Sequence, residues 1–435
     1  MIVSLMLVVQ LAAQDTSRLT LADAAQRALE QHPSVAAARA GRDAAAAAVG
    51  EARAPLFPHL TSSFGATEYA LPNIVYPLSG LDLHNLPLFD RTLSQAAFSL
   101  GYTLFDFGGR TSQVRLAQAQ ERKAEAALDA TSAALVSRVA NAYLRILTTR
   151  GILDAEERQL AALQAEADRT AQLEAQGKAA HVEVLRLAAQ VSRSRADEVS
   201  TRAQLDVAER DLAQLVAFPV DAVRRLLTPV RLTDTTLADR ATLAASAERN
   251  SPDVAQALRT SEAARAGVGV ARASLLPQLQ LSAAYLENGH SLSGYRPYWN
   301  AGLQLTYPIF MGGSRTSAIR QNEATARAAN EQLRDARQVA EQSVDAALAT
   351  LTAAHATVDA LVTAVTQSEE VERIRRLSLV VGSGTETDYL DAEAQLLSNR
   401  ASLVQARNAE IAARVELARV TGELSVGWLT QALAQ

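Results

Sequence analysis

The sequence predicts a mainly α-helical chain with four β-strands, built as two copies of one structural repeat. Three observations predict this fold class. Apolar residues recur every seven positions along two very long stretches, which is typical of helices that pack as coiled coils. Short segments alternate polar and apolar residues, which is typical of strands with one apolar face. Both patterns occur twice along the chain, in the same order.

The repeat is visible as a constant shift along the sequence. Val139 aligns with Val344, 205 positions later, and the tripeptide at 110–112 aligns with the identical tripeptide at 315–317. No gap is needed over more than a hundred residues. Because heptad phase and a tripeptide agree at one shift, we conclude that the long helical stretches belong to a duplicated unit.

A second shift marks an insertion in the first copy. Upstream of the tripeptides, residues 52–60 align with residues 271–279 at a shift of 219 positions. Because 219 exceeds 205 by 14, the first copy carries 14 extra residues between Leu60 and Tyr102. They fall in a proline-containing stretch around 71–88. Insertions are best tolerated at exposed loop tips, so we expect an exposed loop there.

The shifts divide the chain into two repeats with short ends. Each repeat is expected to open with a helix, at 20–54 and 236–273, in which Pro33 and Pro252 predict a start or a kink. The first repeat is 15–228, with a β-hairpin at 60–105, a long helix at 109–176 and a return helix at 180–217. The second repeat is 229–423, with a β-hairpin at 278–309, a long helix at 314–381 and a return helix at 385–421. Residues 424–435 are expected to form a C-terminal tail.

The predicted strands place their large apolar residues on one face and mostly Gln, Asn, Ser, Thr and Gly on the other. Two interpretations remain open. In a soluble protein the apolar face would pack on a core, whereas in a membrane barrel it would meet lipid while the polar face lines water. The candidate membrane-facing residues are Phe98, Leu100, Tyr102, Leu104, Leu279, Leu281, Tyr285, Trp299, Leu303, Leu305 and Tyr307.

The N-terminal residues resemble a secretory signal. An apolar run is followed by small residues, although the usual basic residues before the run are missing, and we expect residues 1–14 to act as a signal peptide. We find no other run that approaches the ~18 apolar residues that a membrane-spanning helix needs. If the chain crosses a membrane, the strands are therefore expected to do so.

The composition argues against several classes of protein. A net charge of -5 gives no electrostatic reason to expect a nucleic-acid partner. Cysteine is absent, which excludes disulfides, thiolate nucleophiles, cysteine metal sites and a lipid-anchored N-terminal cysteine. The six histidines are scattered, and the Gly pairs at 108–109 and 312–313 lack the spacing of phosphate-binding loops. We expect no enzyme, no cofactor and no metal site.

Four strands cannot close a barrel, because about eight is the practical minimum. Open sheet edges inside a membrane would leave backbone groups unpaired, so lipid-facing strands would have to be completed by other copies of the chain. Two, three or four copies would give 8, 12 or 16 strands. Each long helix would form a rod of about 100 Å at 1.5 Å per residue, and would extend such a tube away from the membrane.

The order of elements resembles the TolC family of outer membrane efflux proteins. The likeness covers 20–422, and it rests on the Pro33 and Pro252 openings, on 52–58 with its counterpart 271–277, on the junctions at 105–110 and 310–315, and on 382–392. The resemblance implies a homotrimer with a 12-strand transmembrane β-barrel, continued by an antiparallel coiled-coil barrel of 12 helices.

The resemblance also implies a location and partners. The chain would form an exit duct in the outer membrane of a Gram-negative bacterium, with a periplasmic helical extension and with outer membrane lipid around its strands. It would work with a periplasmic membrane-fusion adaptor and an inner membrane transporter of the RND, ABC or MFS type, as part of an efflux or type I secretion system. The duct itself would conduct passively.

The turn before the last long helix carries the candidate pore residues. The resemblance implies that Asp388 and Asp391 line a constriction, where three copies would form rings of carboxylates that favour cations. A local interpretation is also open, because Thr385 with Asp388 resembles a helix capping box. The first copy has Glu183 and Arg186 at the matching positions.

Three glycines are expected to make the turns at the helical tips and to contribute to adaptor contact: Gly177, Gly382 and Gly384. In the family a Tyr and an Arg just before the acids commonly lock the closed state. Leu379 and Gly384 stand at those positions here, so the lock is unassigned; candidates are Arg375, Arg376 and Arg186.

Two other classes of protein compete with the duct. A periplasmic coiled-coil adaptor or scaffold would explain the long helical hairpins, but not four amphipathic strands between helices. A cytosolic structural rod would not explain the apparent signal peptide.

Overall fold

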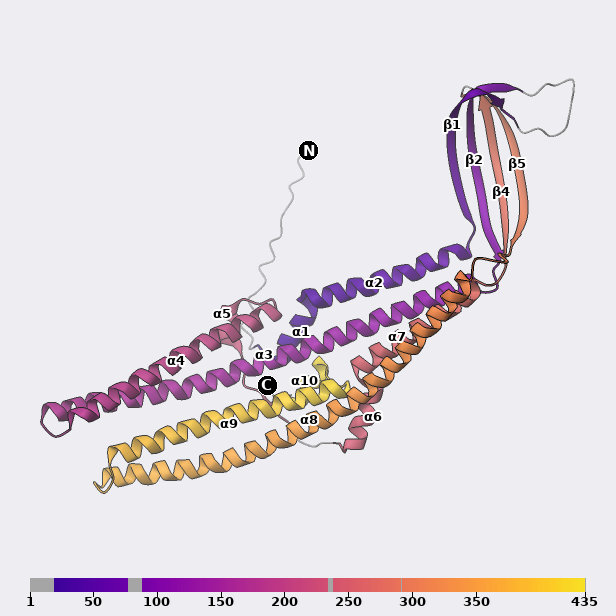
Figure 1. Cartoon of the computed structure of the whole chain (residues 1–435). Coiled ribbons are helices and arrows are strands. Elements are labelled where there is room, and N and C mark those ends of the chain that lie inside the picture. The colour runs from indigo at the N-terminus through magenta and orange to yellow at the C-terminus, as the bar shows by residue number, and fades with distance from the viewer. Residues whose placement is uncertain (1–18, 77–87, 234–237, 291, 435) are drawn as a thin grey trace, which may run out of the picture. The chain divides into compact units, whose positions relative to one another are not determined.

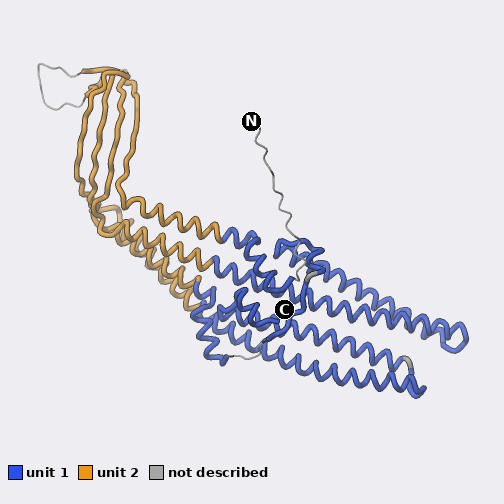
Figure 2. Tube along the Cα trace, turned by 180° about the vertical axis from the view of Figure 1, so that it is seen from behind, with its two compact units in different colours: residues 1–38, 128–255, 336–435 blue, residues 39–127, 256–335 orange. Residues whose placement is uncertain are grey.

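A computed structural model describes residues 19–76, 88–233, 238–290 and 292–434. The chain divides into two compact units (Figure 2). Unit 1 comprises residues 1–38, 128–255 and 336–435, and unit 2 comprises residues 39–127 and 256–335. The expected signal peptide at 1–14 and most of the expected inserted loop, at 77–87, lie outside the described residues.

Two helices of 67 residues dominate the structure (Figure 1). Their interiors contain no proline, and their heptad positions give them a continuous apolar seam. Each continues through a tight turn into an antiparallel return helix. The long helices are α3 (Gly109–Ala175) and α8 (Ser314–Val380), and the return helices are α4 (His181–Leu215) and α9 (Glu386–Thr421).

Each opening helix is divided in two at its proline. The first repeat has α1 (Leu21–Gln31) and α2 (Pro33–Arg53), and the second has α6 (Arg240–Asn250) and α7 (Pro252–Ala273). In both cases the proline is the first residue of the second helix, where its missing N–H costs nothing and its fixed φ suits the helix. A short 3-10 helix, η1 (Ala54–Leu56), leads from α2 into the strands.

Unit 2 contains a four-stranded antiparallel sheet with the order β1-β2-β4-β5. The strands have 16, 17, 13 and 14 residues, so they are longer than the nine to eleven residues that a membrane strand requires. Their outer ends mix polar and apolar residues without a regular alternation, as at 67–74 of β1, so the sequence pattern does not reveal them. The strands are β1 (His59–Ile74), β2 (Phe89–Phe105), β4 (Gln278–His290) and β5 (Ser293–Thr306).

The end of β1 bends across the outer end of the sheet (Figure 1). The pairing of β1 with β2 shifts in register between Glu68 and Asn73, which is a large bulge. Beyond the bulge the Tyr76 hydroxyl donates a hydrogen bond to the Gly294 carbonyl on β5, and the Arg296 guanidinium lies 4.6 Å from the centre of the Tyr76 ring. The first and last strands of the sheet are thus linked at this end.

The core of unit 1 surrounds Tyr143, a fully buried residue of α3. The Tyr143 hydroxyl lies 2.9 Å from the Leu19 carbonyl oxygen and accepts a hydrogen bond from the Thr228 backbone N–H, also at 2.9 Å. Short elements that the sequence analysis did not predict complete this core: α5 (Val220–Leu226), β3 (Arg231–Leu232), α10 (Val426–Ala432) and β6 (Leu433–Ala434).

The residues expected to form a tail therefore carry a helix and a strand instead. Leu429 is fully buried in the core cluster, and β6 pairs with β3. Elements of two to seven residues are too short for a periodic pattern, and tertiary contacts determine their structure.

The prediction that no other stretch of the chain is apolar enough to span a membrane is also wrong. Helix α8 contains an 18-residue stretch that, by length and composition alone, is apolar enough to cross a membrane. The stretch is rich in Ala and Val, and it lies in the middle of a helix whose heptad positions Val344 and Leu351 are buried. Only 11% of this stretch is buried within the single chain, so packing inside the chain does not account for its composition.

Helices of the two repeats meet within unit 1. Gly151 on α3 lies so close to α9 that a Cβ atom at this position would be 2.7 Å from Cγ1 of Val404. Nearby, the Asn408 side-chain amide donates a hydrogen bond of 2.9 Å to the Thr148 hydroxyl. We call this contact of Thr148 and Gly151 with Val404 and Asn408 the intrachain seam.

Candidate functional site

The tip of the second helical hairpin is a turn built around two glycines. Gly382 has φ +75°, a conformation that residues with a Cβ rarely adopt. Gly384 has an ordinary φ, but a Cβ there would lie 3.0 Å from the Ser378 Cβ. The backbone N–H groups of Ser383 and Gly384 both donate to the Ser378 carbonyl, which satisfies the end of α8.

Asp388 lies in the first turn of α9 and has two local partners. Its backbone N–H donates to the Thr385 hydroxyl at 3.2 Å, so Thr385 is the N-cap of the helix. Its carboxylate lies 3.6 Å from the guanidinium of Arg375 on α8. The Thr385 half of the expected capping box is therefore present, whereas the Asp388 carboxylate is paired across the turn of its own hairpin.

Asp391 lies in different surroundings from Asp388. It lines a cleft of about 640 Å³ together with residues of the first hairpin, among them Glu183 and Arg186. These two residues occupy the positions that match the paired acids, and they form an ion pair of 2.9 Å with each other. The structure thus brings Asp391 into one cleft with its first-copy counterparts, while Asp388 stays within its own hairpin.

The tip of the first hairpin uses one glycine in the left-handed region. Gly177 has φ +69°, and the Lys178 N–H donates to the Leu173 carbonyl at 2.8 Å, as in a helix-ending Schellman turn. The imidazole of His181 lies 2.7 Å from the Glu174 carboxylate and links the two helices of this hairpin.

The three candidate lock residues form ion pairs within their own hairpins. Arg375 pairs with Asp388, Arg376 with Glu372 at 3.7 Å, and Arg186 with Glu183. In the described part of the chain none of them forms an ion pair with the other hairpin.

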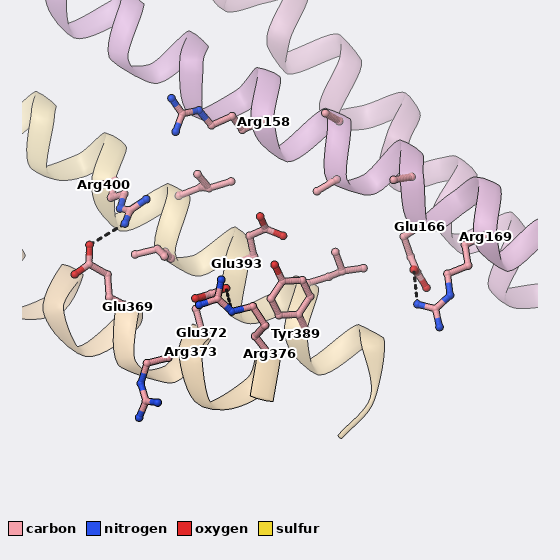
Figure 3. Close-up of a pocket in the computed structure, with 16 residues that line it drawn as sticks. Arg158, Glu166, Arg169, Glu369, Glu372, Arg373, Arg376, Tyr389, Glu393 and Arg400 are labelled. Carbon is pink, nitrogen blue, oxygen red and sulfur yellow. Dashed lines mark hydrogen bonds and ion pairs between the residues drawn. The ribbon is translucent and has the colours of Figure 1, made fainter. Parts of the chain in front are cut away.

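A second, larger cleft lies between α3 and the second hairpin (Figure 3). Its volume is about 980 Å³, and charged side chains from α3, α8 and α9 surround an apolar floor. Most of the charges are paired, as in the Arg400–Glu369 ion pair of 2.8 Å. The charged lining residues are Arg158, Glu166, Arg169, Glu369, Glu372, Arg373, Arg376, Glu393 and Arg400.

Glu393 is the exception among these carboxylates. It is half-buried, and among the described residues it has no hydrogen-bond or ion-pair partner. Burial raises the pKa of Glu393, and the nearby Glu372 carboxylate raises it further. The sequence analysis did not single out this residue, because nothing local to 393 distinguishes it from the many acidic residues on solvated helix faces.

Most of the candidate membrane-facing residues share one face of the sheet. Leu104 lies where the register between β2 and β4 is interrupted, and Phe105 takes the place opposite Leu279. The register places Tyr102 opposite Leu281, which in turn lies opposite Leu303. Among these residues Trp299, Leu303 and Leu305 are strongly exposed. Tyr307 differs from the rest, because it lies one residue beyond β5, where Pro308 cannot continue the hydrogen-bond ladder.

Among the described residues there is no group of three or more His, Asp or Glu side chains arranged to hold a metal ion. The chemistry of both clefts is that of ion pairs and apolar side chains.

Comparison with known proteins adds the family. A family model described as outer membrane efflux protein matches residues 24–217 and 243–423. The outer membrane protein TolC of Salmonella enteritidis is 26% identical over 416 residues, which is 92% of this chain and 81% of TolC. The pyoverdine export outer membrane protein OpmQ of Pseudomonas aeruginosa is 31% identical over 299 residues, which is 66% of this chain and 60% of OpmQ.

Comparison of this chain with solved structures agrees with this result. The outer membrane protein VceC of Vibrio cholerae superposes with a TM-score of 0.75 at 22% sequence identity, covering 92% of this chain and 96% of VceC. The shared architecture extends over both repeats. The chain belongs to the outer membrane efflux protein family.

Proposed function

We propose that three copies of this chain form a continuous duct, and that the duct passively conducts substrates from inner membrane and periplasmic partners to the exterior. As a family member the chain is an outer membrane exit channel for efflux or secretion in a Gram-negative bacterium. The proposal concerns its assembly, its constriction and its partners.

The sheet of unit 2 carries this proposal. One face bears large exposed apolar side chains and the other bears mostly small polar ones, as expected for a wall between lipid and water. Within the described chain β1 and β5 each pair on one side only. Unpaired edges are not tolerated in a bilayer, so other copies must complete the barrel. Three copies would give 12 strands and an aqueous lumen.

The repeat suggests how the helices of neighbouring copies meet. A shift of 205 positions converts Gly151 into Ala356 on α8, and converts Val199 on α4 into Val404. If α8 packs on α4 of the next copy as α3 packs on α9, then Ala356 and Val199 should meet between copies. Both are exposed in the single chain, and Val199 retains 56% of its accessible surface. Such an exposed valine on a long helix is accounted for by a neighbouring copy.

The assembly can be tested with disulfides, because the chain contains no cysteine. In the variant with Val199→Cys and Ala356→Cys, mild oxidation should give cross-linked dimers and trimers on denaturing gels. The matched control carries Thr148→Cys and Asn408→Cys in the intrachain seam, and it should remain monomeric. If the first variant yields only monomers while the control oxidises, the proposed assembly is wrong.

We further propose that Asp388 and Asp391 line the narrowest part of the duct. Three-fold repetition would make each of them a ring of carboxylates, which attracts cations and repels anions. Conductance in planar bilayers tests this assignment. Asp391→Ala should lower the preference for cations and the block by divalent ions, whereas Glu183→Ala should change both less. Unchanged selectivity in both Asp388→Ala and Asp391→Ala would remove the assignment.

The partners proposed are a periplasmic adaptor and an inner membrane transporter of the RND, ABC or MFS type. The adaptor is expected at the helical tips, near Gly177, Gly382 and Gly384. The larger charged cleft beside these tips supports this, because the unpaired Glu393 would accept a basic side chain of an adaptor helix. Glu393→Gln should weaken adaptor retention by about tenfold, since a charge-assisted hydrogen bond is lost. Glu331→Gln, an exposed position of α8 whose partner Arg334 also lies outside the cleft lining, is the control.

A further inference from the structure

A small cleft lies where the helices of the first repeat meet the strands. It has a volume of about 320 Å³ and is formed by the end of α2, η1 and the first two turns of α3. The lining combines two arginines with apolar side chains. The lining residues are Arg53, Leu56, Phe57, Thr111, Val114 and Arg115.

Both guanidinium groups of this cleft are available to a ligand. Arg53 and Arg115 are exposed, and within the described residues neither has an ion-pair or hydrogen-bond partner. The adjacent Arg110 is different, because it binds Asp106 and the Pro55 carbonyl. Two free guanidinium groups beside one cleft suit a phosphate, whose oxygens accept paired N–H donors.

The apolar part of the lining indicates which phosphate compound fits. Phe57 keeps 67% of its surface exposed, and Leu60, three residues further on, keeps 71% on the apolar face of the sheet. An acyl chain along Phe57 and Leu60 would remove this apolar surface from water. A free phosphate ion would leave it exposed.

The second repeat contains the same residues in an altered electrostatic setting. Shifts of 219 and 205 positions convert Arg53 and Arg115 into Arg272 and Arg320. However, the Arg272 guanidinium lies 2.6 Å from the carboxylate of Glu323, a residue whose first-repeat counterpart is Gln118. In the second repeat an internal carboxylate therefore neutralises one of the two guanidinium groups, whereas both are free in the first.

We propose that the cleft formed by Arg53 and Arg115 binds the headgroup of an anionic phospholipid at the periplasmic rim of the barrel. The two guanidinium groups hold the phosphate, and the exposed apolar residues Phe57 and Leu60 hold the first part of an acyl chain. Net positive charge at the cleft selects anionic over zwitterionic lipids. This inference rests on the proposed function, in which the apolar face of the sheet meets lipid.

The experiment uses the full chain, purified in a neutral detergent and depleted of lipid. Native mass spectrometry measures the binding of phosphatidylglycerol, with phosphatidylethanolamine as the zwitterionic comparison. In Arg53→Gln with Arg115→Gln, phosphatidylglycerol binding should fall by about tenfold or more, because charged hydrogen bonds to phosphate are lost. The matched control, Arg272→Gln with Arg320→Gln, should bind within about twofold of the unaltered chain, because Glu323 already neutralises Arg272 and leaves only one guanidinium group for a phosphate.

Two single variants give each repeat the neutral or acidic residue that the other repeat has beside its arginines. Gln118→Glu should weaken phosphatidylglycerol binding, and Glu323→Gln should add a second bound lipid per chain. Heat-modified gel mobility reports whether each variant is folded. Equal binding of phosphatidylglycerol and phosphatidylethanolamine, or no loss in the folded Arg53 and Arg115 variants, would overturn the proposal.

Competition with inorganic phosphate shows whether the cleft binds the phosphate group of a lipid or a free phosphate ion. If millimolar phosphate displaces phosphatidylglycerol completely, the cleft is a phosphate site rather than a lipid site, and the proposal is wrong. Conductance is measured on the same preparations, so that a failure of the lipid site can be distinguished from a failure of the proposed channel function. Channels that conduct normally while lipid binding is unaffected by the variants contradict this inference alone.

Discussion

The two helical hairpins of this chain share one architecture and differ in their side-chain chemistry. The long helices α3 and α8 have the same length of 67 residues, and their buried heptad residues align without a gap. Some of the differences lie at exposed positions. Near the tips, Ile374 and Leu377 of α8 replace Arg169 and Gln172 of α3, and the first keeps 48% and the second 56% of its surface exposed.

This comparison shows that the duplicated pattern encodes the scaffold, while the departures from it encode specific contacts. A coiled-coil rod requires only its heptad positions, so the remaining positions were free to diverge. At some of the differing positions one copy makes a contact that the other lacks, as Tyr143 and Asn408 do. Each prediction below changes positions at which the two copies differ.

The largest expected effect concerns Tyr143, whose counterpart in the second copy is Leu348. Tyr143→Leu would remove the hydroxyl that satisfies the Leu19 carbonyl and the Thr228 N–H, both in a fully buried core. Unpaired buried groups and the smaller side chain together should cost about 2–4 kcal/mol. Thermal unfolding followed by circular dichroism measures this loss. Tyr143→Phe should cost less, since it keeps the ring, and equal stability of all three chains would contradict the argument.

The second effect concerns the acids at the tip of the second hairpin. Arg375 neutralises Asp388, whereas Asp391 shares a cleft with the Glu183–Arg186 pair of the first copy. Arg375→Gln should therefore release the charge of Asp388 and raise the preference of the channel for cations by about twofold. Reversal potentials in planar bilayers measure this change.

Arg186→Gln provides the corresponding test on the first copy. It should also raise cation preference, because it leaves Glu183 unpaired beside Asp391 in the same cleft. A fall in cation preference in both variants would show that neither arginine shields the acids.

The third effect concerns the intrachain seam. Asn408 is buried against Thr148, but their counterparts in the other copy, Ala203 and Ala353, carry no polar group. Thr148→Ala alone should cost about 1–2 kcal/mol, because it leaves the buried Asn408 amide unpaired. Adding Asn408→Ala should recover part of that loss and reproduce the apolar seam of the other copy. Chemical denaturation of the four chains forms a double-mutant cycle, and purely additive losses would refute the coupling.

The sequence predicts this scaffold well because a heptad pattern over sixty residues and a 205-position shift are long-range signals that single substitutions do not erase. It also predicts the Thr385 cap and the Gly177 turn, which depend only on neighbouring residues. Strand length is predicted poorly, since the outer end of β1 mixes polar and apolar residues without a regular alternation, and its pairing with β2 is interrupted between Glu68 and Asn73.

The side-chain contacts around the helical tips could not be predicted from the sequence, for a different reason. Arg375 reaches Asp388 across a turn, and Glu393 is isolated by the packing of three helices. Such arrangements depend on the rotamers of long side chains and on which helices become neighbours. The sequence names Arg375 as one of three candidate lock residues, but it predicts neither the ion pair of Arg375 with Asp388 nor the surroundings of Glu393.

The smallest expected effect separates the hairpins by their response to pH. Arg150 of α3 pairs with Glu209 of α4 at 2.8 Å, and at the position 205 residues later His355 of α8 pairs with Glu410 of α9 at 2.7 Å. The hydrogen bond to Glu410 raises the pKa of His355, and the nearby Asp359 carboxylate raises it further. A pKa that is higher in the folded chain than in the unfolded chain adds stability below the unfolded value of about 6.5, and this stability is lost as pH rises through the folded value. The α8–α9 hairpin should therefore loosen slightly as pH rises through the raised pKa of His355. The middle of the α3–α4 hairpin, away from the His181–Glu174 pair at its tip, keeps the permanently charged Arg150 opposite Glu209. Hydrogen exchange of the two hairpins at a series of pH values, corrected for the intrinsic exchange rates, measures the difference.

His355→Arg, which installs the residue of the first copy, should remove the pH dependence of the second hairpin. A pH dependence that persists in this variant would show that another group is responsible for it.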